Sequence, residues 1–227
     1  MSGEASVGPQ GGGGTPTLPS EEQLVDALQA RMGADAQRRL AEASVAIAGL
    51  GGLGSNIAIA LARTGVGRLH LIDFDVVDLT NLNRQQYGIA DLGRPKTEAL
   101  RDAIVRIDPY LDVVTDRVRL DAALAVDVLG GYPIVVEAFD KPDAKAMLVD
   151  ALCPLPGGPI VVGASGMAGL APANLIATRR ITDRWYLCGD GRSDVGSGLP
   201  LLASRVAICA GHQATAVVQL ILGKDIT

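Results

Sequence analysis

Three glycines at a characteristic spacing are the first residues of this sequence that could bind a ligand. Gly49, Gly51 and Gly54 follow an apolar run, residues 44–48, and match the pattern G-x-G-x-x-G. The first glycine permits a tight turn, the second lets backbone approach a phosphate, and the third lets a helix pack closely on the strand. The helix N-terminus offers free N–H groups to anionic oxygens. The pattern favours a nucleotide-binding turn, although the glycines alone would also fit a purely structural turn.

Polar and charged residues follow the second apolar run, residues 68–72. Asp73 ends that run, where an acidic residue can hold a ribose hydroxyl. The loop beyond it carries further carboxylates and an Asn-x-Asn-Arg-Gln cluster, which together comprise Asp75, Asp78, Asn81, Asn83, Arg84 and Gln85. Arg84 and the later Lys96 suit the charge of a triphosphate, and the carboxylates suit a magnesium ion. Each residue alone fits a solvated charged loop equally well, but the combination favours a nucleoside triphosphate.

The pattern around these residues predicts an α/β fold. Strands and helices alternate, which indicates a doubly wound, Rossmann-like and mostly parallel sheet with helices on both faces. The predicted strands are residues 44–48, 68–72, 112–115, 134–137 and 160–163. The predicted helices are residues 54–64, 94–107, 121–129, 142–152 and 204–222. Two further strands, residues 170–178 and 185–188, have no helix between them and predict an antiparallel C-terminal addition.

The chain divides into a short tail and one domain. Residues 1–19 are rich in Gly, Pro, Ser and Thr, so we expect them to be disordered. Residues 20–227 are enough for a single domain with a large core. Ser20 and Gln23 fit a capping box that begins one or two amphipathic helices ending near Ala43.

Composition limits the class of protein. Hydrophobic residues are 48% of the 227 residues and aromatic residues only 3%, which suits a buried sheet of Ala, Val, Leu and Ile. The net charge of −5, without a Lys/Arg-rich run, argues against nucleic acid as the main partner. We find no apolar run of the ~18 residues that a membrane span needs, no signal-peptide pattern and no disulfide pattern. We therefore expect a cytoplasmic protein that does not bind a membrane.

Five ordered motifs identify a resemblance to a known family. They are residues 49–54, 73–75, 81–85, 93–96 and 137–140. Together they resemble the ThiF/MoeB family, the bacterial relatives of the ubiquitin-activating enzymes, from about Met32 to the C-terminus. The Glu-Ala-Phe-Asp motif and the short length are most similar to a compact ThiF subtype, the sulfur-carrier (ThiS) adenylyltransferases.

The resemblance implies a fold that binds Mg-ATP and a defined reaction. Family members adenylate the C-terminal Gly-Gly carboxylate of a small β-grasp sulfur-carrier protein and release pyrophosphate, and for this subtype the pathway is thiamine thiazole biosynthesis. By this resemblance Gly52 lies beside the α-phosphate, and Asp73 takes the ribose hydroxyls. The residues assigned to the phosphates are Asn81, Arg84 and Lys96, with Gln85 beside them.

Asp140 receives the role of magnesium ligand from the same resemblance, and Arg84, Lys96 and Asp140 are the implied catalytic residues. The position of Asp140 also makes sense without the family. It follows the predicted strand 134–137, and a carboxylate at the carboxyl end of a central parallel strand points into the crevice where such sheets bind ligands.

Three departures from the family pattern matter. Many relatives hold a structural zinc with two Cys-x-x-Cys pairs, whereas Cys153, Cys188 and Cys209 form no such pair, so we expect no zinc. Many relatives also carry an Arg-x-x-Arg-Gln motif that reaches the partner subunit's ATP site. Here only Arg31 could supply that charge, and it is out of the usual register. The asparagine that commonly follows the magnesium aspartate is Lys141.

Cys188 admits two interpretations. Some family members bond covalently to their carrier through a late cysteine, and Arg184 and Arg192, near in sequence, would lower the pKa of this thiol. Alternatively, Cys188 is a packed residue at a strand end, which is the interpretation we favour. We interpret His70 and His212 as packed residues rather than catalysts.

Several functions stay open beside the favoured adenylating enzyme. A Rossmann oxidoreductase would use Asp73 for NAD, but the cluster at residues 81–85 would then have no role. A non-catalytic, scaffold-like subunit would fit the missing arginine motif. A related branch adenylates a small-molecule or tRNA-bound carboxylate. For the favoured function we expect a homodimer, with apolar faces of the helices 20–31 and 204–222 at the interface and Arg31 near the partner's phosphates.

Overall fold

The structure is a computed structural model and describes residues 18–193 and 195–226. Except for Leu18 and Pro19, the tail that the sequence predicts to be disordered lies outside the described residues. None of the described helices is both long and apolar enough to cross a membrane.

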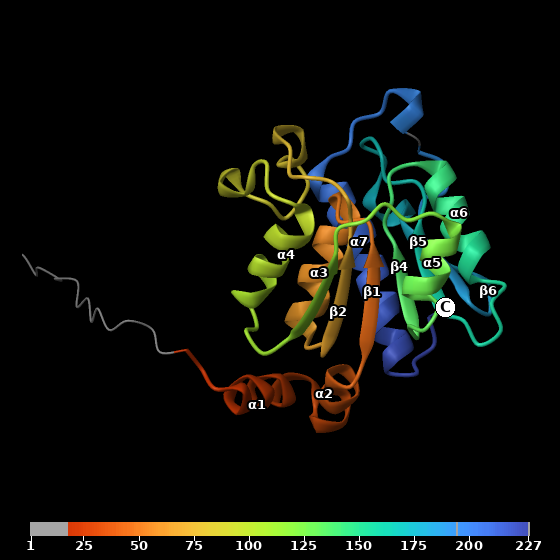
Figure 1. The fold of residues 1–227 in the computed structure, drawn as a ribbon. Coiled ribbons are helices and arrows are strands. Elements are labelled where there is room, and N and C mark those ends of the chain that lie inside the picture. The colour runs from red at the N-terminus through yellow and green to blue at the C-terminus, as the bar shows by residue number, and fades with distance from the viewer. Residues whose placement is uncertain (1–17, 194, 227) are drawn as a thin grey trace, which may run out of the picture.

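A seven-stranded sheet forms the centre of the molecule (Figure 1). Its strands, in chain order, are β1 (Ser44–Ala48), β2 (Arg68–Ile72), β3 (Asp112–Asp116), β4 (Ile134–Glu137), β5 (Ile160–Ala164), β6 (Ala177–Thr182) and β7 (Trp185–Gly189). Their order across the sheet is β3-β2-β1-β4-β5-β7-β6, and all neighbours run parallel except β6 and β7. The chain reverses its direction of strand addition between β1 and β4, which is where such sheets bind ligands.

Helices cover both faces of this sheet. The described α-helices are, in chain order, α1 (Glu21–Met32), α2 (Ala34–Ala41), α3 (Gly52–Thr64), α4 (Lys96–Val105), α5 (Ala122–Leu129), α6 (Pro142–Leu152) and α7 (Ala203–Ile221). Helices α3 to α7 are the ones that cover the two faces. Because successive strand residues point to opposite faces, β1 contributes to two cores. Val45 and Ile47 join the core under α3, α4 and α7, whereas Ala46 and Ala48 join the core under α5 and α6.

The first two helices lie at the amino ends of the strands, away from the loops that follow the strands (Figure 1). The predicted capping box of α1 is confirmed, because Ser20 Oγ accepts the N–H of Gln23 and Gln23 Oε1 accepts the N–H of Ser20. Gly33, with φ of 87°, separates α1 from α2. Arg39 of α2 donates to two carbonyls at the end of α7, which fixes this helix pair to the domain.

The predicted fold class is confirmed, with one local error. Strands β1, β2 and β4 have the predicted bounds, and α6 does as well. The strand predicted for residues 170–178 is wrong, since these residues form an irregular segment with a 3-10 turn, Ala173–Leu175, and β6 begins only at Ala177. Pro172 lacks the N–H that a ladder needs, and the actual strand is a polar edge strand that apolar patterning does not reveal.

The third glycine of the turn has a packing role that predicts a large effect of substitution. A Cβ on Gly54 would lie 1.8 Å from the carbonyl oxygen of Gly49. We expect Gly54→Ala to lower the free energy of unfolding by about 3 kcal/mol or more, because backbone must move to admit the methyl group. Urea denaturation followed by the fluorescence of Trp185, the single tryptophan, measures the change.

Gly211→Ala is the matched control. Gly211 lies in the exposed part of α7, and a Cβ there meets no atom within 4 Å. This variant should gain roughly 0.5–1 kcal/mol from helix propensity. A Gly54→Ala protein within about 0.5 kcal/mol of the parent would contradict the packing role of Gly54.

Candidate active site

A cavity of about 700 Å³ opens at the carboxyl ends of the central strands. It is bordered by the loops that follow β1, β2, β3 and β4. The sequence-selected residues that line it are Gly49, Gly51, Gly52, Asp73, Asp75, Asn81, Arg84, Gln85, Lys96 and Asp140. Only Gly54 of the selected set is absent from this lining, because it is buried where α3 meets the strand.

The glycine turn lets α3 point its N-terminus at the cavity. Gly49 has φ of 92°, and a Cβ there would lie 2.8 Å from the carbonyl oxygen of Ala138 on the loop after β4. Gly51 is the N-cap of α3, and the helix begins at Gly52. The first N–H groups of a helix have no partner within the helix, so this end of α3 can bind an anionic oxygen.

Asp73 ties the glycine turn to the loop after β2. Its Oδ2 accepts the N–H of Leu50 at 2.6 Å and its Oδ1 accepts the N–H of Asp75 at 2.8 Å. Asp73 is buried, yet each carboxylate oxygen keeps a second lone pair. The arrangement leaves Asp73 able to accept a hydrogen bond from a ligand hydroxyl.

The predicted cluster after residue 80 folds against the glycine turn. Arg84 donates from Nη1 to the carbonyl of Thr80 and to Oδ1 of Asn83, and both acceptors are uncharged. The carbonyl of Arg84 accepts from Asn56 of α3. Gln85 is buried with its Oε1 unpaired among the described residues, beside the position that a Cβ on Gly51 would take. The uncompensated guanidinium and the unpaired amide both suit a polar ligand in the cavity.

Lys96 is the first residue of α4 and is 6% exposed. The side-chain Nζ of Lys96 lies 3.1 Å from Oδ2 of Asp75, and the backbone N–H of Lys96 donates to the backbone carbonyl of Asp75. The short bridge between Val76 and Pro95 holds these two segments together. A buried ammonium is therefore fixed at the cavity wall by a partly exposed carboxylate.

Asp140 is exposed at the cavity edge between β4 and α6. Asp143, in the first turn of α6, lines the same edge. Among the described residues there is no group of three or more His, Cys, Asp or Glu side chains that could hold a metal ion. Magnesium bound to a nucleotide takes one or two protein carboxylates and fills its other positions with phosphate and water, so the residues present fit that ion.

Residues 25–227 match the family model described as ThiF family. This chain belongs to the ThiF family.

Named relatives match part of this ThiF-family chain. The probable adenylyltransferase/sulfurtransferase MoeZ of Mycobacterium tuberculosis (strain ATCC 25618 / H37Rv) is 41% identical over 133 residues, which are 58% of this chain and 34% of that protein. The molybdopterin-synthase adenylyltransferase of Escherichia coli (strain K12) is 38% identical over 132 residues, which are 58% of this chain and 53% of that protein. The matches thus cover between about a third and a half of these relatives.

A solved structure matches nearly the whole ThiF-family fold. The structure is that of E. coli tRNA N6-threonylcarbamoyladenosine dehydratase, TcdA, in complex with AMP. Its comparison with this chain gives a TM-score of 0.80 and a sequence identity of 22%. The match covers 92% of this chain and 98% of that chain. At this identity the similarity establishes the shared fold.

The β3 side of the cavity carries apolar and cationic side chains that the sequence motifs did not indicate as ligand contacts. The guanidinium of Arg119 lies 3.7 Å above the ring of Phe74, and both line the cavity. Val118, Leu120 and Met147 add apolar surface beside them. The position of Arg119 just after β3 could have indicated it, because ligands bind beyond the carboxyl ends of parallel strands. This side suits a flat, weakly polar group such as a base.

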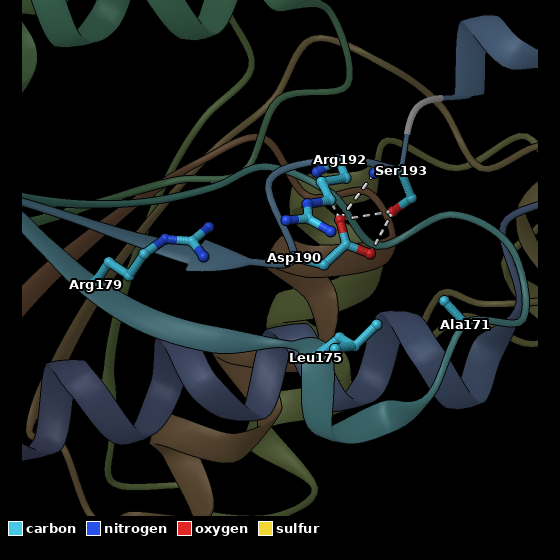
Figure 2. Close-up of a pocket in the computed structure, with 6 residues that line it drawn as sticks. All are labelled: Ala171, Leu175, Arg179, Asp190, Arg192 and Ser193. Atoms are coloured by element: carbon cyan, nitrogen blue, oxygen red, sulfur yellow. Dashed lines mark hydrogen bonds between the residues drawn. The ribbon is translucent and has the colours of Figure 1, made fainter.

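A second cavity of about 450 Å³ lies near the carboxyl end of β7 (Figure 2). Its Asp190 carboxylate accepts the backbone N–H groups of Arg192 and Ser193 and pairs with Arg205 of α7. Burial alone would raise the pKa of Asp190, but these hydrogen bonds lower it to about 2. The Asp190–Arg205 pair therefore stays ionised and fastens the loop after β7 to α7.

Cys188 is fully buried at the end of β7. Arg184 and Arg192, its neighbours in sequence, have other surroundings. Arg184 donates to the carbonyls of Cys153, Leu155 and Gly158, and Arg192 lines the second cavity. Burial raises the pKa of Cys188 to about 11. These observations support the packed interpretation over a covalent one.

The histidines also have packing partners. His70 Nε2 lies 2.9 Å from Asp116 Oδ2, and His212 Nδ1 lies 3.0 Å from Thr178 Oγ1. Neither is among the described residues that line the large cavity.

The raised pKa of Cys188 predicts an unreactive thiol in the native protein. With a pKa of about 11, only about one molecule in a thousand carries the thiolate at pH 8, and the thiolate is the reactive form. Ellman's reagent at pH 8 should therefore modify Cys188 only after denaturation, and Cys188→Ser should not change the native labelling rate. The native labelling rate of Cys153, which is half-buried in the same protein, serves as the comparison. Rapid native labelling mapped to Cys188 by mass spectrometry would contradict this assignment.

Proposed function

We propose that this chain is an ATP-dependent adenylyltransferase that activates the C-terminal Gly-Gly carboxylate of a small β-grasp sulfur-carrier protein. The observation that supports this most strongly is that Arg84, Lys96 and Asp140, from three separate segments, line one cavity with the glycine turn. The relatives named adenylyltransferases and the AMP complex of the TcdA fold support the same type of reaction.

The chemistry is a displacement at the α-phosphorus of ATP. A carboxylate oxygen of the carrier attacks the α-phosphorus, the bond from that phosphorus to the bridging oxygen breaks, and pyrophosphate leaves with the electron pair. The products are the acyl adenylate and pyrophosphate. Arg84 and Lys96 neutralise charge on the phosphates, and this stabilisation grows as negative charge develops in the transition state.

The remaining cavity residues position the nucleotide. The N–H groups from Gly52 onward bind the α-phosphate side, and Asp73 accepts a ribose hydroxyl. Asn81 and Gln85 donate to phosphate oxygens, and Asp75 holds the ammonium of Lys96 until the nucleotide arrives. We assign a magnesium ion to Asp140, where it would supply charge neutralisation for the leaving pyrophosphate. We expect no structural zinc.

The specific carrier and pathway rest on the sequence resemblance. The Glu-Ala-Phe-Asp motif favours a ThiS-like carrier and thiamine thiazole biosynthesis, in the cytoplasm. An oxidoreductase that uses NAD would need Asp73 but would leave Arg84, Lys96 and Asp140 without a role. A non-catalytic subunit is disfavoured because all three of these residues are present in one cavity.

A second candidate is activation of a carboxylate on tRNA. It is supported by the fold similarity to TcdA, which is named a tRNA N6-threonylcarbamoyladenosine dehydratase. The net charge of −5 argues against it, since nucleic-acid binding depends largely on basic side chains. ATP–pyrophosphate exchange that requires tRNA and ignores Gly-Gly carriers would establish this second candidate.

Asp140→Ala tests the proposed reaction. We expect the loss of a metal ligand to lower carrier-dependent ATP–pyrophosphate exchange by about 100-fold or more, with the fold intact. Asp150→Ala is the matched control, because Asp150 is exposed on the same helix, α6, and does not line the cavity. Circular dichroism and the melting temperature verify folding. Parental exchange in a well-folded Asp140→Ala protein would rule out the assignment.

We further propose a homodimer in which α1 contacts the partner. Leu24, Val25 and Leu28 of α1 are only half-buried in one chain, and Arg31 is exposed. Val206 and Val217 of α7 are fully buried against their own domain, so they do not contribute to a contact surface. Arg31 is in the last turn of α1. Helix α1 lies at the opposite end of the sheet from the loops that follow the strands (Figure 1), so only a partner's site could use Arg31.

Sedimentation at micromolar concentration should show the dimer. Arg31→Ala should preserve it and slow adenylation at least tenfold, about 1.4 kcal/mol of transition-state stabilisation. A monomer in sedimentation would refute the dimer, and full activity of Arg31→Ala would refute the role of Arg31.

A further inference from the structure

A buried ion pair lies next to the turn that carries Asp140. Glu137 is the last residue of β4, and its side chain is 2% exposed. Lys145, in the second turn of α6, is 22% exposed and places its Nζ 3.0 Å from Oε1 and 3.1 Å from Oε2 of Glu137. The pair thus joins the strand before Asp140 to the helix after it.

The Glu137 carboxylate also holds the backbone of the turn itself. Its Oε1 accepts the N–H of Phe139 at 2.8 Å, one residue before Asp140. Its Oε2 lies 3.5 Å from the N–H of Ala164 at the end of β5. One carboxylate therefore fixes the segment on both sides of Asp140 and against the neighbouring strand.

The surroundings are built to admit this carboxylate. A Cβ on Gly163 would lie only 3.1 Å from Glu137 Oε2, so the absence of a side chain at Gly163 leaves room for it. From α7, the Nε2 of Gln213 donates to the carbonyls of Glu137 and Val162 at 3.0 and 3.1 Å. Four elements, β4, β5, α6 and α7, thus converge on the strand end that carries the turn.

Stability alone is a weak reason for such a pair. Desolvation of two charges costs several kcal/mol each, and apolar replacements of similar volume are often neutral or stabilising. The feature that distinguishes this pair is its location, with one of its hydrogen bonds made to the residue that precedes Asp140.

We propose that Glu137 and Lys145 are positioning residues that fix Asp140 for the bound metal–nucleotide. The inference rests on the proposed adenylation function. Asp140 is exposed and lies in a short turn between β4 and α6, so its direction depends on the two ends of that turn. A misplacement of about 1 Å at a reacting centre can lower a rate 100-fold. The contacts that hold Asp140 in place therefore matter for the reaction rate.

The test uses the full-length chain and a small set of variants. Glu137→Gln keeps the size and an acceptor for Phe139 but removes the charge that binds Lys145. The double variant Glu137→Asp/Lys145→Arg shortens the acid and lengthens the base, so it rebuilds a pair of similar reach. Arg39→Met is the control for general destabilisation, because Arg39 binds carbonyls of Ile221 and Leu222 at the far end of the domain.

Two readouts separate positioning from stability. The first is ATP–pyrophosphate exchange as a function of magnesium, and the second is Mn²⁺ binding to the protein–ATP complex by electron paramagnetic resonance. Glu137→Gln should lower kcat about tenfold, raise the magnesium concentration for half-maximal rate severalfold and weaken Mn²⁺ binding, with the KM for ATP within twofold. The double variant should recover most of each loss, and Glu137→Asp alone should not.

The outcomes that overturn the inference are distinct from failure of the proposed function. Parental kcat and Mn²⁺ binding in folded Glu137→Gln would overturn it, as would equal losses in Arg39→Met. If Glu137→Gln does not fold, Glu137→Asp with and without Lys145→Arg decides by the same criteria. A parent protein that binds ATP and Mn²⁺ but exchanges no pyrophosphate with any carrier would refute the proposed function, while Mn²⁺ binding still tests the positioning pair.

Discussion

The buried carboxylate of Asp73 is the contact on which the geometry of the site depends. It accepts one N–H from the glycine turn, at Leu50, and one from the loop after β2, at Asp75. Hydrogen bonds to an ionised group at a buried position are strong and set one arrangement of the two backbones. Both loops therefore face the cavity in register with each other before any ligand is present. Tyr87 adds a second link, since its hydroxyl donates to the carbonyl of Leu50.

The cavity lining carries both cationic and acidic side chains, which suits a ligand that combines negative charge with a metal ion. The cationic side chains Arg84 and Lys96 come from the loop after β2 and from α4, while the exposed carboxylate of Asp140 comes from the segment after β4. Arg84 hydrogen-bonds only to uncharged acceptors among the described residues, so its charge is available to an anion. A nucleoside triphosphate with a divalent cation would satisfy the guanidinium of Arg84 and the exposed carboxylate of Asp140 at once. The apolar surface near Phe74 would then take the base.

Sequence patterning could predict the fold and ten of the residues that line the cavity, because both follow from local rules. The glycine turn, Asp73 and Asp140 each follow an apolar strand, and parallel strands bring their carboxyl ends to one edge of the sheet. The same rules could not reveal Lys145 as the partner of Glu137, nor Arg119 as the neighbour of Phe74, because these contacts depend on how separate elements pack. Cys188 shows the converse. Arg184 and Arg192 are close to it in sequence but point elsewhere, and burial raises its pKa instead.

The claim that one ATP spans this cavity is tested most directly by a crystal structure of the full chain with ATP and magnesium. The geometry predicts a triphosphate at the N-terminus of α3 in contact with Arg84 and Lys96, a ribose on Asp73 and a metal ion on Asp140. A nucleotide bound elsewhere, or bound in the cavity with its phosphates away from Arg84, Lys96 and Asp140, would contradict it.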